Sequence, residues 1–135
     1  MGEHPTRVRR RIVPDDVQLQ IILGSLLGTA RIEGEPGERR MRVTHAPERE
    51  SYIRWKYDRL GPLSSDPPRL SEDGVGFDTI AHPIFDDLAP LFAAPRGRRR
   101  VMHDLLAPLG LAVWMSDHGR IELRAEVFVP LRKAA

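Results

Sequence analysis

Two apolar segments rich in small residues, each followed at once by an alternating strand pattern, constrain the fold of this chain most. The first, Val17 to Gly28, is aliphatic apart from a few positions and includes glycines at 24 and 28; the second is Pro108 to His118. A helix that is apolar on most sides must be buried on most sides. Pro14 with Asp15 and Asp16 supplies helix-start chemistry before the first segment. The pattern predicts two buried helices, the first of which allows close approach of another backbone.

An internal repeat joins these two segments. Thr29-Ala30-Arg31-Ile32-Glu33 is echoed by His118-Gly119-Arg120-Ile121-Glu122. Both copies end an apolar helix and open a strand in the same register. A repeat in a shared structural context indicates two related units in one chain.

The remaining patterns predict an α+β fold with an antiparallel sheet packed on helices. Strand alternation flanks a Pro36-Gly37 turn, which is typical of a β-hairpin with Ile32, Met41 and Val43 toward the core. The other expected elements are helices at 48–60, 82–94, 101–106 and 108–118, strands around Leu70 and at 75–80, and one last alternating strand at 120–129.

Composition excludes several classes of site and leaves the partner open. The 135 residues suit one domain or two small halves with a shared core, and the lack of cysteine excludes disulfides and Cys-ligated metals. All 21 basic residues except Lys56 and Lys133 are arginine, whose planar fork suits phosphate and guanine, although a GC-rich genome would also favour arginine codons. No apolar run is long enough for a membrane span. We expect a cytoplasmic protein, nucleoid-associated if bacterial, with no membrane partner.

The two repeated segments resemble the motifs of the LAGLIDADG homing endonuclease family, in the branch with two motifs in one chain. Residues 22–30, Ile-Leu-Gly-Ser-Leu-Leu-Gly-Thr-Ala, are similar to a first motif that commonly reads Gly-x-Leu-Leu-Gly-Asp-Gly. Residues 111–119, Leu-Ala-Val-Trp-Met-Ser-Asp-His-Gly, are similar to a second motif, commonly Leu-Ala-x-Trp-x-Met-Asp-Asp-Gly. Tyr52 with Trp55-Lys56, the Phe77-x-Thr79 pair and Phe92 follow in the family's order.

The resemblance implies that the two motif helices pack side by side as the seam between αββαββα halves. Each half would lay an antiparallel sheet into the major groove of double-stranded DNA, which a ribbon of strands can enter. A solvated face of ion pairs and a solvated basic linker are the alternatives for these side chains. The candidate DNA contacts are Arg31, Glu33, Arg40, Arg42, Thr44, Arg98, Arg99, Arg100, Arg120, Glu122 and Arg124.

The sequence departs from the family at the catalytic positions. Catalytic members carry an acid at the end of each motif helix to hold a divalent metal, but here these positions are Thr29 and His118. Asp117 is the nearest acid, and because a helix turns about 100° per residue it would point elsewhere. We therefore assign no catalytic residue, no metal site and no cofactor; Mg²⁺ enters only if an altered endonuclease site exists. A lone His at a helix end is more often structural.

The chain divides by pattern into a flexible basic arm at 1–13, a first half at 14–100, and the second motif helix with its strand at 101–135. The residues after Gly119 are too few for a complete second half, so we expect a truncated half or completion by a homodimer partner, paired through the apolar edge at 127–131. The leading hypothesis is a DNA-binding protein without cleavage activity. The alternatives are a metal-dependent site-specific endonuclease with an altered site that recruits Asp117, Glu33 or Asp104, an RNA-binding maturase-like splicing factor, and a protein-binding module.

Overall fold

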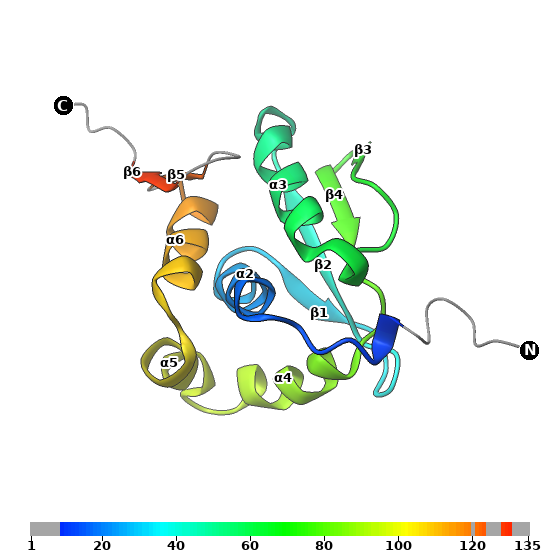
Figure 1. The fold of residues 1–135 in the computed structure, drawn as a ribbon, viewed down its shortest axis with the longest axis vertical. Helices are drawn as coiled ribbons and strands as arrows, with labels where there is room; N and C mark the ends of the chain where they lie inside the picture. Colours follow the sequence, from blue (N-terminus) through cyan, green and yellow to red (C-terminus); the bar gives the residue numbers. More distant parts are fainter. Residues whose placement is uncertain (1–8, 120, 124–127, 131–135) are drawn as a thin grey trace, which may run out of the picture.

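The computed structural model describes residues 9–119, 121–123 and 128–130, and it places one helix at the centre of the fold. This helix, α2 (Asp16–Leu27), is surrounded by α6 (Pro108–Asp117), by α3 (Glu50–Leu60) and by a sheet, as Figure 1 shows. The α+β class with an antiparallel sheet on helices is confirmed.

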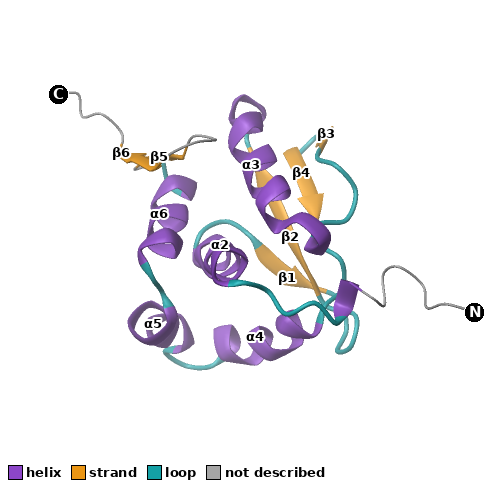
Figure 2. Cartoon of the chain, in the orientation of Figure 1, coloured by secondary structure: helices purple, strands orange, loops and turns teal. Residues whose placement is uncertain are grey.

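A four-stranded antiparallel sheet has the strand order β1-β2-β4-β3. Helices α3 and α2 cover one face of it, with α3 against β2 and β4 and α2 against β1 (Figure 2). The predicted hairpin and the two strands around residue 73 are both present. The remaining bounds are β1 (Arg31–Glu33), β2 (Arg40–His45), β3 (Arg69–Ser71), β4 (Gly74–Asp78), α4 (Pro83–Ala93), α5 (Gly97–Arg100), β5 (Ile121–Leu123) and β6 (Phe128–Pro130).

Helix α2 begins with a capping box and continues as a buried apolar rod. The Asp15 side chain accepts from the Gln18 backbone N–H, and the Gln18 side chain accepts from the Asp15 N–H, so two of the unpaired donors at the helix start are satisfied. Ile21, Ile22 and Leu23 are fully buried on successive faces. This confirms the expectation that a helix without a wide polar face lies inside the protein.

Small residues allow α2 and α6 to pack closely. A Cβ added at Gly24 would lie 2.4 Å from the carbonyl oxygen of Gly110 and 2.8 Å from Cβ of Val113. A Cβ at Gly28 would overlap the carboxylate of Asp117. The two repeated segments are therefore adjacent helices whose backbones approach at glycine.

The strand alternation separates a core face from a polar face. Met41 and Val43 of β2 are fully buried, and Val75 and Phe77 of β4 are nearly so. Their neighbours Arg40, Arg42, Thr44 and Asp78 are half-buried on the opposite face. The inward residues pack with α2 and α3 in one core, and the outward face of the sheet is left polar.

The end of the chain differs from the predicted single strand. Strand β5 pairs antiparallel with β6, so the segment expected as one strand contains two, and Phe128 and Val129 of the expected edge pair with β5 on one side. The alternation of apolar and polar residues runs from 121 to 129 in the sequence, with no Gly, Pro or Asn between 123 and 128, so the pattern alone did not predict two strands. Val127 and Leu131 of that edge lie outside the described residues.

Two further elements bear on the predicted organisation. Residues 97–100, expected as a connector, form the short helix α5. Within the expected arm, Arg10 pairs with Glu38 at 2.8 Å and the carbonyl of Ile12 lies 2.8 Å from Nε2 of His82; residues 1–8 lie outside the described part. None of the described helices has the length and apolarity needed to cross a membrane.

Candidate nucleic-acid interface and motif seam

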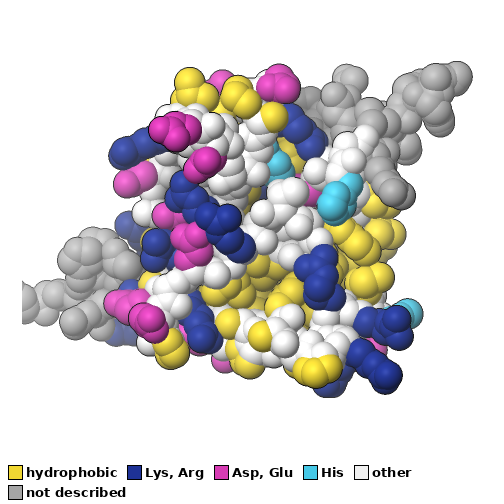
Figure 3. All heavy atoms as spheres, turned by 180° about the vertical axis from the view of Figure 1, so that it is seen from behind, with side chains coloured by type: hydrophobic (Ala, Val, Ile, Leu, Met, Phe, Trp, Pro, Cys, Tyr) yellow, Lys and Arg dark blue, Asp and Glu magenta, His cyan; other side chains and the backbone are white. Residues whose placement is uncertain are grey.

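The outer face of the sheet collects charged side chains in cross-strand rows. Strand register places Arg31 opposite Arg42, and Arg42 opposite Asp78. The neighbouring row joins Glu33 to Arg40. Seen from this side, basic and acidic side chains are intermixed over the sheet, whereas apolar side chains gather over α6 (Figure 3). The predicted polar face therefore exists as a single surface.

Ion pairs organise this surface without neutralising it. Asp78 accepts from both Arg40 and Arg42, and Glu33 accepts from Nε of Arg31 at 2.6 Å. The hydrogen bond from Arg31 lowers the pKa of the Glu33 carboxyl, so Glu33 is firmly anionic. Arginines still outnumber acids across β1, β2 and β4. Arg31, Arg40 and Arg42, which the sequence offered either as DNA contacts or as members of an ion-paired face, are all in ion pairs.

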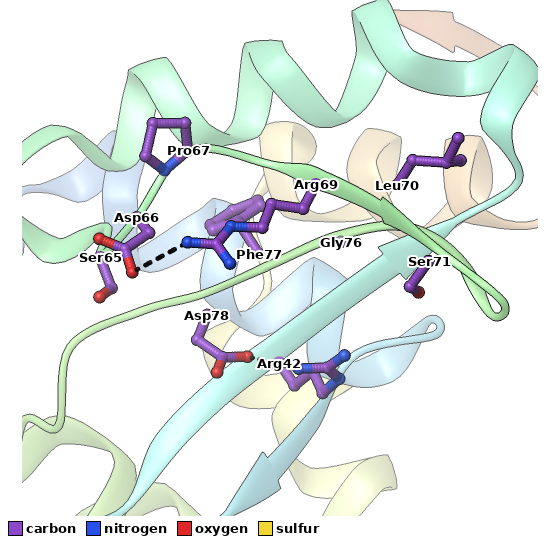
Figure 4. A pocket seen from close by; sticks show the side chains of 10 residues that line it. All are labelled: Arg42, Ser65, Asp66, Pro67, Arg69, Leu70, Ser71, Gly76, Phe77 and Asp78. Atoms are coloured by element: carbon purple, nitrogen blue, oxygen red, sulfur yellow. Dashed lines mark hydrogen bonds and ion pairs between the residues drawn. The ribbon is translucent and has the colours of Figure 1, made fainter.

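A groove of about 440 Å³ lies beside Arg42 on this face. Gly76 of β4, the strand between β2 and β3, is one of its lining residues and adds no side chain to it. Figure 4 shows Arg69 extended toward Asp66, an ion pair of 3.8 Å, and Asp78 beside Arg42. The groove thus offers both donors and acceptors to a ligand that enters from the sheet side.

The ends of the two motif helices form the second candidate region. Thr29 and His118, which the sequence resemblance places at the motif ends, are exposed, whereas the side chain of Asp117 is fully buried. Its Oδ1 accepts from the Tyr52 hydroxyl at 2.5 Å and from Nζ of Lys56 at 2.9 Å. Its Oδ2 accepts from the Thr29 backbone N–H at 3.2 Å. Asp117 therefore ties α6 to α3 and to the end of α2.

Burial dominates the electrostatics of this cluster. Lys56 is fully buried, and desolvation lowers its pKa although Asp117 opposes the shift. Desolvation, and then the positive charge of Lys56, lowers the pKa of His45 to about 4, so His45 is neutral near pH 7. Burial, assisted by Asp117, raises the pKa of the Tyr52 hydroxyl, which stays protonated. The Asp117 carboxylate is thus held by one cation and neutral donors.

The donor set at the helix ends does not fit a divalent metal. Mg²⁺ prefers carboxylate and water oxygens in octahedral geometry. The exposed groups are a hydroxyl and an imidazole, and the oxygens of Asp117 are already occupied by protein donors. In the described part of the chain, no three His, Asp or Glu side chains are grouped so that they could hold a metal ion.

Arginines occupy the carbonyl ends of both motif helices. Arg98, expected as a phosphate contact or a solvated linker residue, donates to the carbonyls of Leu26 and Leu27 at the end of α2. Arg49 donates to the carbonyl of Ser116 at 2.6 Å, near the end of α6. A guanidinium at a helix C-terminus satisfies carbonyls that lack intrahelical partners and compensates the negative end of the helix dipole.

The other predicted DNA contacts lie away from the sheet or outside the described residues. Arg99 and Arg100 are exposed on α5, at a distance along the chain from the sheet. Arg120 and Arg124 lie outside the described residues, and of Glu122 only the backbone pairing with Val129 is described.

Sequence reasoning missed several residues of both regions. Asp78 and Arg69 share the polar face with the predicted arginines, and alternation along 75–80 was a signal that could have placed Asp78 there. Lys56 lies four residues after Tyr52 on the apolar stripe of α3. A lysine on such a stripe requires a buried partner, but only the structure shows that this partner is Asp117.

Comparisons with known proteins agree with this geometry. The LAGLIDADG DNA endonuclease family matches residues 19–131. Protein RecA of Mycolicibacterium flavescens is 29% identical over 118 residues, which are 82% of this chain and 28% of that protein. Protein RecA of Mycolicibacterium fallax is 29% identical over 132 residues, 93% of this chain and 31% of that protein. The chain therefore spans less than a third of the length of these relatives.

One solved structure shares the fold. It is the homing endonuclease I-WcaI bound to its DNA recognition sequence, with a TM-score of 0.63 and 15% sequence identity. The likeness covers 81% of this chain and 54% of that one.

Proposed function

The chain belongs to the LAGLIDADG DNA endonuclease family, and on that premise we propose that it binds double-stranded DNA through the outer face of its sheet and does not cleave it. One observation carries the proposal. The outer face of the four-stranded sheet carries Arg31, Arg40 and Arg42, whereas Thr29 and His118 stand where the family resemblance expects acids and Asp117 is buried against Lys56.

The sheet face has the chemistry for reading DNA. B-DNA's major groove is about 12 Å wide and admits a ribbon of strands, and arginine makes its commonest specific contact to guanine O6 and N7. Arg31, Arg40 and Arg42 lie on adjacent strands of that face. The shared fold with the homing endonuclease I-WcaI, whose structure contains its DNA recognition sequence, supports DNA as the partner.

The motif ends lack the chemistry for metal-dependent cleavage. In metal-assisted phosphodiester cleavage, bound cations stabilise the attacking and leaving oxygens, and hard oxygen ligands must hold them. Thr29 presents a neutral hydroxyl and His118 an imidazole, which is a poor match for Mg²⁺. No carboxylate in the described seam is free to replace the missing acids, because Asp117 is fully engaged.

Fluorescence anisotropy with labelled duplex DNA over a range of salt concentrations tests the binding. Wild-type protein should bind at about 50 mM salt and weaken as salt rises, because phosphate contacts release counterions. Arg42→Ala should weaken specific binding by about 1–3 kcal/mol. Arg54→Ala is the matched control, since Arg54 lies on α3, which covers the other face of the sheet. Absence of binding at low salt, or equal losses in both variants, would contradict the proposal.

A plasmid-library incubation with Mg²⁺ or Mn²⁺ tests the absence of cleavage. Intact plasmid is expected with wild-type protein. Cutting that disappears in Asp117→Asn would instead establish the altered-site endonuclease. A structured RNA competitor that displaces duplex DNA at equal or lower concentration would favour the maturase-like alternative over the DNA-binding function.

A further inference from the structure

A single carboxylate, Asp78, lies between two arginines on the outer face of the sheet. Its Oδ1 accepts from Nη1 of Arg42 at 3.1 Å, and its Oδ2 accepts from Nε of Arg40 at 3.3 Å. The three side chains are 28–40% exposed, so they are neither in the core nor free in solvent. Both carboxylate oxygens are used, one for each guanidinium.

The hydrogen bonds to Asp78 leave a pair of adjacent donors on each arginine, and in the pair on Arg40 Nη2 also lies 3.9 Å from Oε1 of Glu33, an ion pair. Arg40 is held through Nε, so its two terminal amino groups remain together; Arg42 is held through Nη1, so Nε and Nη2 remain together. Two adjacent N–H donors are what a bidentate contact to guanine O6 and N7 requires. Because long side chains lose rotamer freedom on binding, holding them beforehand lowers the cost of the contact.

We propose that Asp78 is a positioning residue for base recognition, which fixes Arg40 and Arg42 in the orientation that reads two guanines. This proposal rests on the proposed DNA-binding function and names the residue that makes that binding sequence-specific. In this proposal Asp78 does not contact the bases itself, and it affects recognition only by orienting Arg40 and Arg42.

Strand geometry limits the spacing of the two guanines. Arg40 and Arg42 are two residues apart on one strand and one face, which separates their Cα atoms by about 6.7 Å. Base pairs along one strand of DNA are about 3.4 Å apart. The recognition sequence should therefore contain two guanines, on either strand, within three consecutive base pairs.

The groove beside Gly76 supports the same assignment. It opens next to Arg42 and Asp78, and no side chain at position 76 blocks a base edge or phosphate from approaching this end of the sheet. Arg69 and Asp66, which also line the groove, pair with each other at 3.8 Å, and both side chains are about four-fifths exposed. The groove therefore supplies a matched control, Asp66, which is a carboxylate on the same face that holds neither Arg40 nor Arg42.

Two steps test the proposal. Wild-type protein first selects its preferred duplex from a randomised library. Competition binding with single-base variants of that duplex then measures the preference at each position. The selected sequence should contain the guanine pair. Asp78→Asn should reduce the preference for each guanine by at least about fivefold, the lower end of one bidentate contact. Asp66→Asn, which makes the same change of charge, should keep the wild-type preference. A preference ratio within one preparation is independent of any unfolded fraction.

The outcomes separate this inference from the function beneath it. If Asp78→Asn binds all duplexes more tightly by one common factor and keeps its preference, Asp78 contributes only charge and the inference is wrong. A selected sequence without the guanine pair overturns it as well. If wild-type protein binds no duplex at low salt, the proposed function fails and the inference fails with it.

Discussion

Loss of the buried lysine is the perturbation that most directly probes how the motif helices are joined. Lys56→Met keeps an unbranched apolar chain of similar length in α3 but removes the cation 2.9 Å from Asp117. Both side chains are fully buried, so the remaining carboxylate would be a buried charge without its counterion. Removing one member of such a pair costs about 3–5 kcal/mol.

The neutral hydrogen-bond donors around Asp117 place the expected loss of stability at the lower end of this range of about 3–5 kcal/mol. Asp117 would keep its hydrogen bonds from Tyr52 and from the Thr29 backbone, so we expect about 3 kcal/mol. The double variant Lys56→Met with Asp117→Asn leaves no buried charge and should recover at least half of that loss. The two substitutions should therefore be strongly non-additive, as for residues in direct contact.

Urea denaturation followed by circular dichroism measures these free energies. Arg59→Met is the control, because Arg59 is an exposed cation on the same helix and its loss should change stability by no more than about 0.5 kcal/mol. A cost below about 1 kcal/mol for Lys56→Met, or additive effects in the double variant, would refute the reasoning that Asp117 depends on Lys56.

Two further predictions concern the seam and the titration of its histidine. Gly24→Ala should destabilise the fold by about 1–3 kcal/mol in the same denaturation assay, because its Cβ would overlap the Gly110 carbonyl; a gain in stability, as at an exposed helical glycine, would show that the helices are not packed there. His45 has its pKa lowered to about 4, so the unfolded chain binds more protons between pH 6.5 and 4, and stability should fall by about 3 kcal/mol as pH drops through that window. His45→Gln should flatten that part of a denaturation series at several pH values; an unchanged slope would assign the pH dependence to other groups.

The patterned parts of the fold could be predicted from the sequence because each follows from a local rule. Apolar periodicity gave the helices around α2 and α6, and alternation with a Pro-Gly turn gave β1 and β2 with the correct inward residues Met41 and Val43. The repeat gave the pairing of the two helices through the family resemblance. These features depend on residues close together in the chain.

The parts that could not be predicted depend on contacts between distant residues. The Lys56–Asp117 pair joins positions 61 residues apart, and Arg98 reaches a helix end 71 residues before it. No periodicity marks such partners. The pairing of β5 with β6 was missed for another reason, since the sequence between them alternates without a Gly, Pro or Asn that would indicate a turn. The sequence therefore predicted the polar face of the sheet, but it did not predict the hydrogen bonds and ion pairs that hold the candidate site together.

The claim that the motif ends hold no metal can be tested with Mn²⁺. Electron paramagnetic resonance measures how much Mn²⁺ is bound by the complex of protein and selected duplex and how much by the duplex alone. The account predicts that the complex immobilises no more Mn²⁺ than the duplex does, because Thr29 and His118 supply no carboxylate and Asp117 is held by Lys56. Additional Mn²⁺ bound in the complex and lost in Asp117→Asn would contradict it.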